Sequence, residues 1–549
     1  MRARRVWLAA VLGAAISAST IAAFPAGAAA SADQLSIIQD STRVLDDPAR
    51  TLGTFRELGA STVRVIVVWA QIAPDWSSTR RPRDFDASDP AAYPAANWAP
   101  YDAVVRIAQA DGIGVDFTLS GGAPRWAEGP GIPRAAVDNQ FWAWRPSPAE
   151  FGRFAHAVAE RYSGSYVPTG ETAPLPRVDF WAVWNEPNFG EDLGPQAVNG
   201  SRVAVAPRAY RGLVSQTWNA LQATGHAGDT FLIGEFAPRG LSARGTAKRP
   251  HGLPGQFGQT KPLRFLRTLY CVDSSYRPLR GPAARAVGCP ASGAGSRRFR
   301  ASNPGLFQAT GLADHPYPQN QPPTIELNRD PDIAPFPRLG DLERALDRAQ
   351  GAYGAHRRLP IYNTEYGYIT HPSNLGAYAS PDKAAYYINW AEYLSWKQPR
   401  LASTMQYLLY DPPLYPVVPG DGGFTSGLLF ANGTPKPGYD AYRLPLYLPV
   451  TSVRRGRSLE VWGCVRPARY ALLDTGEAQL AEIEFAPRSG GGYQTLQTVL
   501  VGDGDDCYFD LRLAFPSSGV LRLAYTYPPG SLGLAGTTVY SRAVSVSVR

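Results

Sequence analysis

Two glutamates each follow a short, mostly apolar run of residues and stand where a strand would end. Glu186 lies in WAVWNEPN after the run 178–184, and Glu365 lies in LPIYNTEYG after the run 359–362. Such runs are typical of buried parallel strands, whose carboxyl ends meet at one mouth of a barrel. Two carboxyl groups brought together at such a mouth are the minimum equipment for cleaving a glycosidic bond. The two motifs therefore predict a two-carboxylate site.

The elements that must position these glutamates follow from alternating short apolar runs and longer amphipathic segments. We expect strands at 35–39, 62–68, 114–119, 178–184, 230–234, 311–314, 359–362 and 404–409, and helices at 48–58, 100–110, 148–162, 207–223, 340–353 and 381–395. Eight strands separated by helices predict an α/β fold, a (β/α)8 TIM barrel, over residues 31–446. A doubly wound open sheet is the alternative, but no glycine-rich phosphate loop follows the first strand.

Beyond residue 446 the sequence changes to short alternating strands separated by Gly, Ser and Asp turns. The strand candidates are SLEVWGCV, AEIEFAP, TLQTVLVG, CYFDLRLAF, GVLRLAYTY and AVSVSVR. Their spacing predicts a small antiparallel β-sandwich over residues 447–549. Its role is either carbohydrate binding or packing, and the absence of obvious aromatic platforms in its turns favours packing.

The N-terminus has the composition of an export signal. MRARR precedes an apolar stretch rich in small residues, and AGAAASA follows. This pattern predicts a signal peptide over residues 1–30 and a secreted protein with no stable membrane association after cleavage. A retained membrane anchor is the alternative, because the apolar stretch is nearly long enough to span a bilayer. The net charge of +8 includes no basic block interleaved with aromatic residues, so we expect no nucleic-acid partner.

The four cysteines all lie beyond the predicted signal peptide. Cys271 and Cys289 are close together in a loop over 238–304 rich in Gly, Pro, Arg and Ser, and Cys464 and Cys507 lie in the C-terminal region. An even number in an exported protein favours disulfides, and pairing sequence neighbours is one of three connectivities. A zinc site is the alternative, but the spacings are wrong for it. A disulfide within the long loop favours an ordered rim of the active site.

The two glutamate motifs resemble those of glycoside hydrolase clan A, the retaining (β/α)8 glycosidases. The clan carries its acid/base at the end of the fourth strand, where Trp-Asn-Glu-Pro stands at 184–187, and its nucleophile at the end of the seventh, where Thr-Glu-Tyr-Gly stands at 364–367. The resemblance covers residues 33–447 and is nearest to families 39 and 5. It implies that Glu365 attacks the anomeric carbon while Glu186 protonates the leaving oxygen and later activates water.

The resemblance also implies roles for four further residues. Asn185 would hydrogen-bond the sugar 2-hydroxyl, a contact that strengthens in the transition state. Arg64 in STVRV would hold the nucleophile ionised, and His315 and Tyr317 in DHPYP would lie around it. The alternatives are a structural carboxylate partner for Arg64, a core position for His315 and loop packing for Tyr317.

Other residues at the strand ends offer polar or aromatic contacts to a sugar. Glu235 ends the fifth strand in LIGEFAP and either binds a sugar hydroxyl or pairs with Arg239. Trp69, after the second strand, and Trp126, after the third, are the best candidates for stacking on a sugar face. Core packing is the equal alternative for both.

The end of the eighth strand departs from the clan. Many clan A families carry a Trp there, whereas this chain has MQYLLYD, so Tyr410 or Gln406 is expected to cover the sugar. The expected partner is a carbohydrate: a polysaccharide, an oligosaccharide or a glycoside. A transglycosylase with the same two glutamates and a non-catalytic glycan-binding barrel are the alternatives. No cofactor-binding signature or metal site is predicted, and the reaction needs neither.

Overall fold

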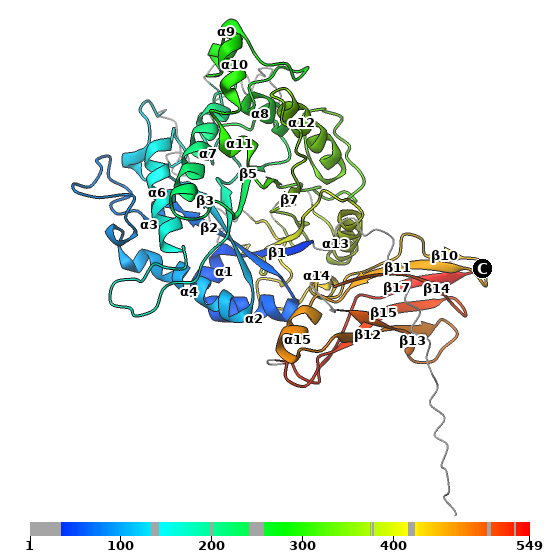
Figure 1. The fold of residues 1–549 in the computed structure, drawn as a ribbon. Helices are drawn as coiled ribbons and strands as arrows, with labels where there is room; N and C mark the ends of the chain where they lie inside the picture. The colour runs from blue at the N-terminus through cyan, green and yellow to red at the C-terminus, as the bar shows by residue number, and fades with distance from the viewer. Residues whose placement is uncertain are drawn as a thin grey trace, which may run out of the picture.

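The computed structural model describes residues 34–132, 142–197, 201, 203–240, 257–373, 375, 378–414, 423–501, 507–531 and 534–549. In this part of the chain, eight parallel strands form a barrel surrounded by helices, and further strands pack at one side (Figure 1). The predicted barrel followed by a smaller β-structure is therefore confirmed. The predicted signal peptide lies outside the described residues. None of the described helices is long and apolar enough to cross a membrane.

The barrel strands pair in sequence order, and the last returns to the first. They are β1 Leu35–Gln39, β2 Thr62–Val68, β3 Gly114–Ser120, β4 Phe180–Val183, β5 Thr230–Phe236, β6 Gly311–Asp314, β7 Ile361–Asn363 and β8 Ser403–Tyr407. Backbone hydrogen bonds close the barrel next to β7, where Ile361 N donates to Arg400 O at 2.7 Å and Ala402 N to Ile361 O at 2.9 Å. Both faces of the strands are covered, which explains their nearly continuous apolar runs.

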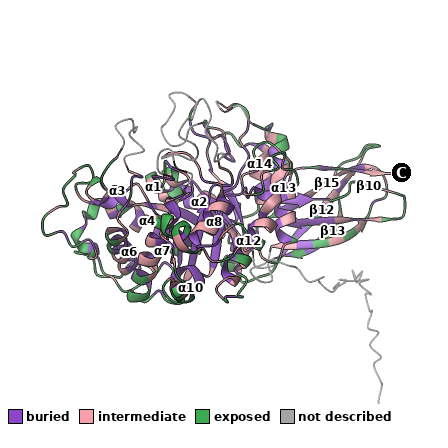
Figure 2. Cartoon of the chain, turned by 90° about the horizontal axis from the view of Figure 1, so that it is seen from above, coloured by how far each residue is buried: buried purple, intermediate pink, exposed green. Residues whose placement is uncertain are grey.

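Helices follow the strands and cover the outside of the barrel. The main ones are α2 Pro48–Leu58, α4 Ala95–Asp111, α6 Pro148–Arg161, α7 Ala206–Ala223, α8 Pro262–Leu269, α12 Leu339–Gly351, α13 Pro381–Trp396 and α14 Pro437–Arg443. Six of these, α2, α6, α7, α8, α13 and α14, carry a proline in the first turn, where the missing N–H costs no hydrogen bond. Buried residues follow the strands and the inner sides of the helices (Figure 2).

The C-terminal strands form two sheets around a separate apolar core. One contains β10 Ser452–Val453, β12 Gln479–Pro487, β13 Gln494–Val501, β15 Gly519–Thr526, β16 Thr538–Tyr540 and β17 Val544–Val548; the other contains β9 Leu446–Tyr447, β11 Ser458–Cys464 and β14 Tyr508–Ala514. All neighbours are antiparallel except β10 and β17. The sequence did not predict helix α15, Ala468–Thr475, although Gly476 ends it with a φ of 73°.

Both disulfides have the predicted pairing, Cys271–Cys289 and Cys464–Cys507. The first lies outside the barrel, against the first turns of α7. Cys271 follows the C-terminal end of α8, and Arg211 of α7 donates to Cys271 Sγ at 3.1 Å and to Gly288 O at 2.8 Å. In the described chain no hydrogen bond joins either cysteine to Glu186 or Glu365, so the expected place at the rim of the active site stays a prediction.

Candidate active site

Glu186 and Glu365 meet at the carboxyl ends of β4 and β7. One oxygen of each carboxylate lies within 4.8 Å of one oxygen of the other. Their side chains are 17% and 10% exposed, so both reach the surface of the site. The residues beneath them have no exposed side-chain surface. The two predicted catalytic residues are therefore the acidic groups of this cluster that a substrate can touch.

The backbone that presents Glu186 is held in an uncommon conformation. Trp184 has a φ of 63° and Glu186 a φ of 41°, in the left-handed region that non-glycine residues rarely occupy. Hydrogen bonds hold this turn: Trp184 N donates to Leu119 O at 2.7 Å, and Phe189 N donates to Glu186 O at 2.8 Å. Strain of this kind persists only where surrounding contacts determine it, and it is concentrated at functional sites.

The second asparagine of WNEPN anchors the same loop. Asn188 is fully buried, and its amide nitrogen donates to Ala237 O and Thr260 O, both at 2.9 Å. Its carbonyl oxygen accepts from Ala237 N at 2.8 Å. Asn188 thus ties the loop after β4 to the loop after β5. This role of Asn188 was not predicted from the sequence, although a polar residue in a short motif between buried strands is a signal for it.

Arg64 on β2 is the cation that organises the buried part of the site. It donates to Glu365 Oε1 at 2.7 Å, to Glu235 Oε2 at 2.6 Å and to Asn185 Oδ1 at 3.0 Å. It also donates to Thr118 Oγ1 at 3.0 Å and to Gln39. Burial opposes its charge, but Glu235 and Glu365 outweigh burial and raise the pKa of Arg64. Arg64 therefore holds the predicted nucleophile by a charged hydrogen bond, as the sequence implied.

Glu235, at the end of β5, lies beneath the two exposed carboxylates. Its side chain is fully buried and accepts from Arg64, from Thr364 at 3.1 Å and from His315. The expected pairing with Arg239 is wrong, because Arg239 pairs with Glu326. Burial raises the pKa of Glu235, but the charge of Arg64 and the contacts of His315 outweigh it and lower the pKa. Glu235 is therefore ionised, and it stabilises the site by pairing with Arg64 and His315.

His315 links three carboxylates. Its Nδ1 lies 2.9 Å from Glu186 Oε1 and 3.5 Å from Glu365 Oε2, and its Nε2 lies 2.7 Å from Glu235 Oε2. Burial alone would lower its pKa, but Glu365, Glu186 and Glu235 raise the pKa of His315 to about 10. At neutral pH the ring is therefore a cation that donates from both nitrogens. The alternative of a histidine bonded only to backbone is wrong.

Tyr317 contacts the candidate nucleophile and packs against two further aromatic residues. The hydroxyl of Tyr317 donates to Glu365 Oε2 at 3.0 Å, and burial together with the charge of Glu365 raises the pKa of Tyr317. Its ring lies 6.3 Å from that of Tyr407 and 5.2 Å from that of Phe424. Tyr407 is the last residue of β8, whereas the sequence predicted that this strand ends two residues further on.

Gln406 and Tyr410, which were expected to cover the sugar in place of a Trp at the end of the eighth strand, make other contacts. Gln406 is buried, and its amide donates to the backbone oxygens of Tyr407 at 2.8 Å and Ser426 at 2.7 Å. Tyr410 packs under the guanidinium of Arg43, 5.0 Å from the ring centre, and lines a hollow of about 250 Å³ beside α2. Neither residue contacts Glu186 or Glu365 by any hydrogen bond found in the described chain.

The two tryptophans expected to stack on sugars are packing residues. Trp69 is fully buried, with its ring stacked on Phe154 at 5.7 Å. Trp126 packs edge-on against Trp69 at 6.1 Å and against Phe85 at 5.8 Å, and its indole donates to Pro74 O at 3.2 Å. The core alternative is correct for Trp69, because a side chain without exposed surface cannot meet a sugar. Trp126 is half-buried, and its ring packs in the same aromatic cluster as Trp69.

Asp192 is a further carboxyl group at the site, and the sequence analysis missed it. It follows the WNEPN motif, and its backbone oxygen accepts from the Trp184 indole at 3.0 Å. Burial, followed by the nearby charge of Glu186, raises its pKa, while a hydrogen bond from Asn185 opposes the rise. Asp192 thus holds the amide of Asn185 from the side opposite to Arg64.

Two more carboxyl groups lie deeper in the barrel. Asp116 on β3 and Asp314 on β6 are fully buried, and none of their side-chain oxygens has a hydrogen-bond partner within the described residues. Burial raises both pKa values, as does the charge of Glu235. We conclude that both groups are protonated at neutral pH, because an ionised carboxylate without a donor is very costly inside a protein.

Glu186, His315 and Glu365 have the composition of a metal site, since one ligand atom from each lies within 4.8 Å of the others. A histidine binds a metal through an unprotonated nitrogen. Both nitrogens of His315 are occupied by carboxylates, and the raised pKa keeps the ring protonated. The three residues therefore fit an ion-pair network better than a metal centre.

Comparisons with known proteins add only general likeness. No protein-family model and no curated protein matches the chain. It is similar to a family 39 glycoside hydrolase from Bacteroides cellulosilyticus WH2, with 13% identity, coverage of 88% of this chain and 80% of that one, and a TM-score of 0.42. It is similar to a glucosidase from Croceicoccus marinus, with 12% identity, coverage of 88% of this chain and 93% of that one, and a TM-score of 0.44. It is also similar to a family 1 β-glucosidase from Thermotoga maritima, with 14% identity, coverage of 72% of this chain and 86% of that one, and a TM-score of 0.40. Likeness at this level carries no argument, so the function below rests on the site itself.

Proposed function

We propose that this protein is a secreted, retaining glycoside hydrolase of the clan A type, acting on a plant or microbial glycan or glycoside. The observation that carries the proposal is the approach of Glu186 and Glu365 to within 4.8 Å, oxygen to oxygen, at the barrel mouth. Retaining glycosidases hold their two carboxyl groups about 5–5.5 Å apart, whereas inverting ones leave about 6.5–9.5 Å for a water molecule. The short separation favours direct attack by one carboxylate.

The contacts of Glu365 favour it as the nucleophile. It accepts from Arg64 at 2.7 Å and from Tyr317 at 3.0 Å, one donor for each oxygen. Both contacts stabilise the ionised carboxylate. In the first step Glu365 forms a bond to the anomeric carbon as the bond to the leaving oxygen breaks, which gives a covalent glycosyl-enzyme.

Glu186 is then the acid/base. It gives its proton to the leaving oxygen in the first step and takes one from water in the second, so the configuration at the anomeric carbon is retained. The only hydrogen bond of its carboxylate found in the described chain is with His315 Nδ1, at 2.9 Å. Asn185, held by Arg64 and Asp192, is positioned beside it to hydrogen-bond the sugar 2-hydroxyl.

A substrate screen combined with two variants tests the proposal. Aryl glycosides and polysaccharides are screened, and the anomeric configuration of the first product is followed by NMR. We expect retention, no turnover in Glu365→Ala, and in Glu186→Ala a larger loss for poor leaving groups than for activated aryl glycosides. The exposed Glu171, paired with Arg106 on the surface, supplies the control Glu171→Ala, which should retain full activity.

Added azide separates the two roles. In Glu186→Ala, azide attacks the glycosyl-enzyme and gives a glycosyl azide of retained configuration; in Glu365→Ala it attacks the substrate directly and gives the inverted azide. Inversion by the wild type, or full activity in either glutamate variant, would contradict the assignment. A sugar acceptor replacing water in the second step would reveal a transglycosylase, because transfer products then exceed free sugar.

A further inference from the structure

Trp76 differs from the other tryptophans of the described chain, because it alone is largely exposed, with 42% of its surface accessible. It lies a few residues after α3, Trp69–Ile72, which directly follows β2. It therefore stands at the carboxyl ends of the barrel strands, the same end as Glu186 and Glu365. Trp142 packs against it edge-on, with ring centres 5.2 Å apart and an angle of 79° between the planes. A T-shaped contact with one neighbour can cover at most one of the two faces of Trp76.

A chain of close contacts connects this pair to the candidate active site. A Cβ on Gly122 would lie 2.1 Å from the Cβ of Trp142, and a Cβ on Gly121 would lie 2.6 Å from the ring of Trp184. Trp184 directly precedes Asn185 and stands two residues before Glu186. Because Gly121 and Gly122 have no side chains, Trp184 and Trp142 can both pack closely against the backbone after β3. These contacts place Trp142 at the rim of the site.

Backbone hydrogen bonds fix the rim that carries both rings. Ala123 N donates to Trp142 O at 2.8 Å, and Arg125 N donates to Trp76 O at 2.7 Å. The segment after Trp142 is held from the other side, because Gly194 N donates to Ala143 O at 2.8 Å. The loops after β2, β3 and β4 therefore meet around the pair, and their hydrogen bonds hold the backbone that carries both rings.

The chemistry of the pair fits a sugar better than a protein partner. Aromatic faces stack on the CH-lined face of a pyranose, and a single exposed indole is sufficient for this contact. A protein interface needs a broad patch. The other large exposed apolar residues of the described chain are Val167, Ile325, Leu327, Tyr378, Tyr386, Val450, Leu473, Leu480, Leu500 and Tyr540, none of which belongs to the loops after β2 and β3.

We propose that Trp76 and Trp142 form a sugar-binding platform at the barrel rim, which stacks on a pyranose ring of a glycan chain away from the bond that is cleaved. The inference rests on the proposed function and deepens it, because a platform outside the catalytic centre implies a substrate of several sugar units. Oligosaccharides and polysaccharides then bind better than small glycosides that fill the catalytic centre alone.

Affinity electrophoresis in gels with soluble xylan, mixed-linkage β-glucan, galactomannan or xanthan tests the platform. The Glu365→Ala chain is used as parent, so that binding is measured without digestion and independently of hydrolysis. We expect at least one polysaccharide to retard the parent. Adding Trp76→Ala should weaken that binding about tenfold, whereas Trp76→Phe, which keeps an aromatic face, should retain most of it. Tyr540→Ala, on an exposed strand of the C-terminal sheets, is the matched control and should bind like the parent.

Three results would overturn the platform. They are a parent that no polysaccharide of the panel retards, a Trp76→Ala variant that binds like the parent, and an equal loss in Trp76→Ala and Tyr540→Ala. Self-association of the parent that Trp76→Ala abolishes would instead assign the pair to a protein interface. Melting curves of all variants separate a lost contact from a lost fold. Because retention of configuration by the wild type is measured separately, failure of the platform and failure of the proposed hydrolase are distinguishable.

Discussion

A carboxylate that attacks carbon must stay ionised, whereas its partner must hold a proton until the leaving oxygen needs it. The two glutamates of this site differ in the partners of their side chains. The Glu365 carboxylate accepts from Arg64 and Tyr317, whereas the Glu186 carboxylate is hydrogen-bonded only to His315 among the described residues. Because the two side chains are the same residue type, their division of roles comes from their neighbours.

The hydroxyl of Tyr317 should contribute to turnover. Tyr317→Phe removes the donor 3.0 Å from Glu365 Oε2 and keeps the ring. A hydrogen bond to a charged group is worth about 1.5–3 kcal/mol, so we expect kcat/KM to fall roughly 10- to 100-fold. Tyr410→Phe, which alters a tyrosine beside Arg43, is the control and should leave kcat/KM unchanged. Equal kinetics for Tyr317→Phe and the wild type would remove Tyr317 from the site.

His315 should make stability depend on alkaline pH. Its pKa of about 10 in the folded chain lies above the ordinary value of 6.5, so folding binds the proton. The stabilisation is complete below about pH 6.5 and is lost as the pH rises through 10. We expect the urea midpoint of the wild type to fall between pH 7 and 10, and that of His315→Gln, already lower, to change less. Parallel profiles for the two proteins would contradict a protonated His315.

At the scale of elements, the barrel separates chemistry from support. The strand carboxyl ends carry Glu186 and Glu365, whereas the Cys271–Cys289 disulfide lies outside the barrel, against Arg211 of α7. Barrel enzymes build their active sites from the loops at the carboxyl ends of the strands. The Cys271–Cys289 bond has no hydrogen bond to either glutamate in the described chain, so we expect it to affect folding and to leave catalysis unchanged.

Replacing Cys271 and Cys289 by alanine tests this separation. The bond closes a loop with a sequence separation of 18, so its loss should cost about 3 kcal/mol in the chain-entropy model. The unfolding midpoint should fall, while KM and kcat of the folded enzyme should stay those of the wild type. The matched pair Cys464–Cys507, with a separation of 43, should cost about 4 kcal/mol. A changed KM in the first variant would place its loop at the active site after all.

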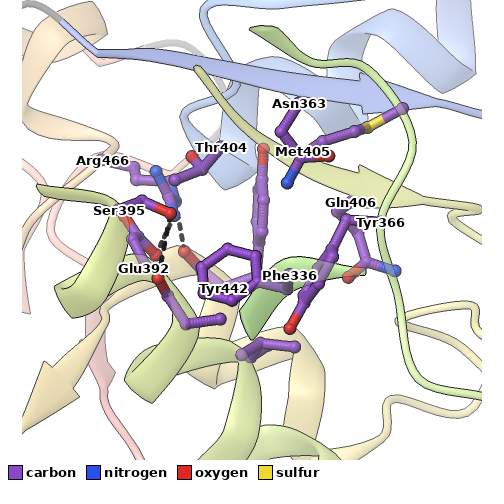
Figure 3. Close-up of a pocket in the computed structure, with 12 residues that line it drawn as sticks. Phe336, Asn363, Tyr366, Glu392, Ser395, Thr404, Met405, Gln406, Tyr442 and Arg466 are labelled. Atoms are coloured by element: carbon purple, nitrogen blue, oxygen red, sulfur yellow. Dashed lines mark hydrogen bonds and ion pairs between the residues drawn. The ribbon is translucent and has the colours of Figure 1, made fainter. Parts of the chain in front are cut away.

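At the scale of the whole molecule, the C-terminal sheets are joined to the barrel by buried polar and aromatic contacts. Arg466, just after β11, pairs with Glu392 of α13 and donates to Tyr442 O at 2.6 Å. This pair lies beside a cavity of about 20 Å³, which residues of α13 and β8 line together with Asn363 and Tyr366. Figure 3 shows the pair among the lining residues. Trp396 and Trp462 pack next to it, with ring centres 6.1 Å apart. These contacts favour a structural role for the sheets.

Arg466→Met should destabilise the whole chain. It leaves the buried carboxylate of Glu392 without its cation, and breaking a buried ion pair costs about 3–5 kcal/mol. We expect a single unfolding transition at a clearly lower temperature, because barrel and sheets share this contact. Arg106→Met, which breaks a half-exposed pair with Glu171, is the control and should change stability little. Two separate transitions in Arg466→Met would show that the sheets unfold independently.

The sequence by itself determined the local elements and the two principal residues. Apolar runs and first-turn prolines predicted the eight barrel strands and most helices, because burial and backbone geometry act within a few residues of the chain. The motifs around Glu186 and Glu365 stand at strand ends, so strand order alone brought them to one mouth. The disulfide pairing followed from sequence proximity in the same way.

Only the tertiary structure decided which neighbours surround these glutamates and which aromatic residues remain exposed. Trp69 and Trp76 are seven positions apart, yet one is fully buried and the other is 42% exposed. Their residue type and strand-end position are alike, and the packing of α6 and of the loop after β3 separates them. The triple contact of His315 likewise joins glutamates from the ends of three other strands, and the support of Asn185 by Asp192 depends on the path of the loop after β4. Such contacts depend on side-chain directions and loop paths that no local pattern encodes.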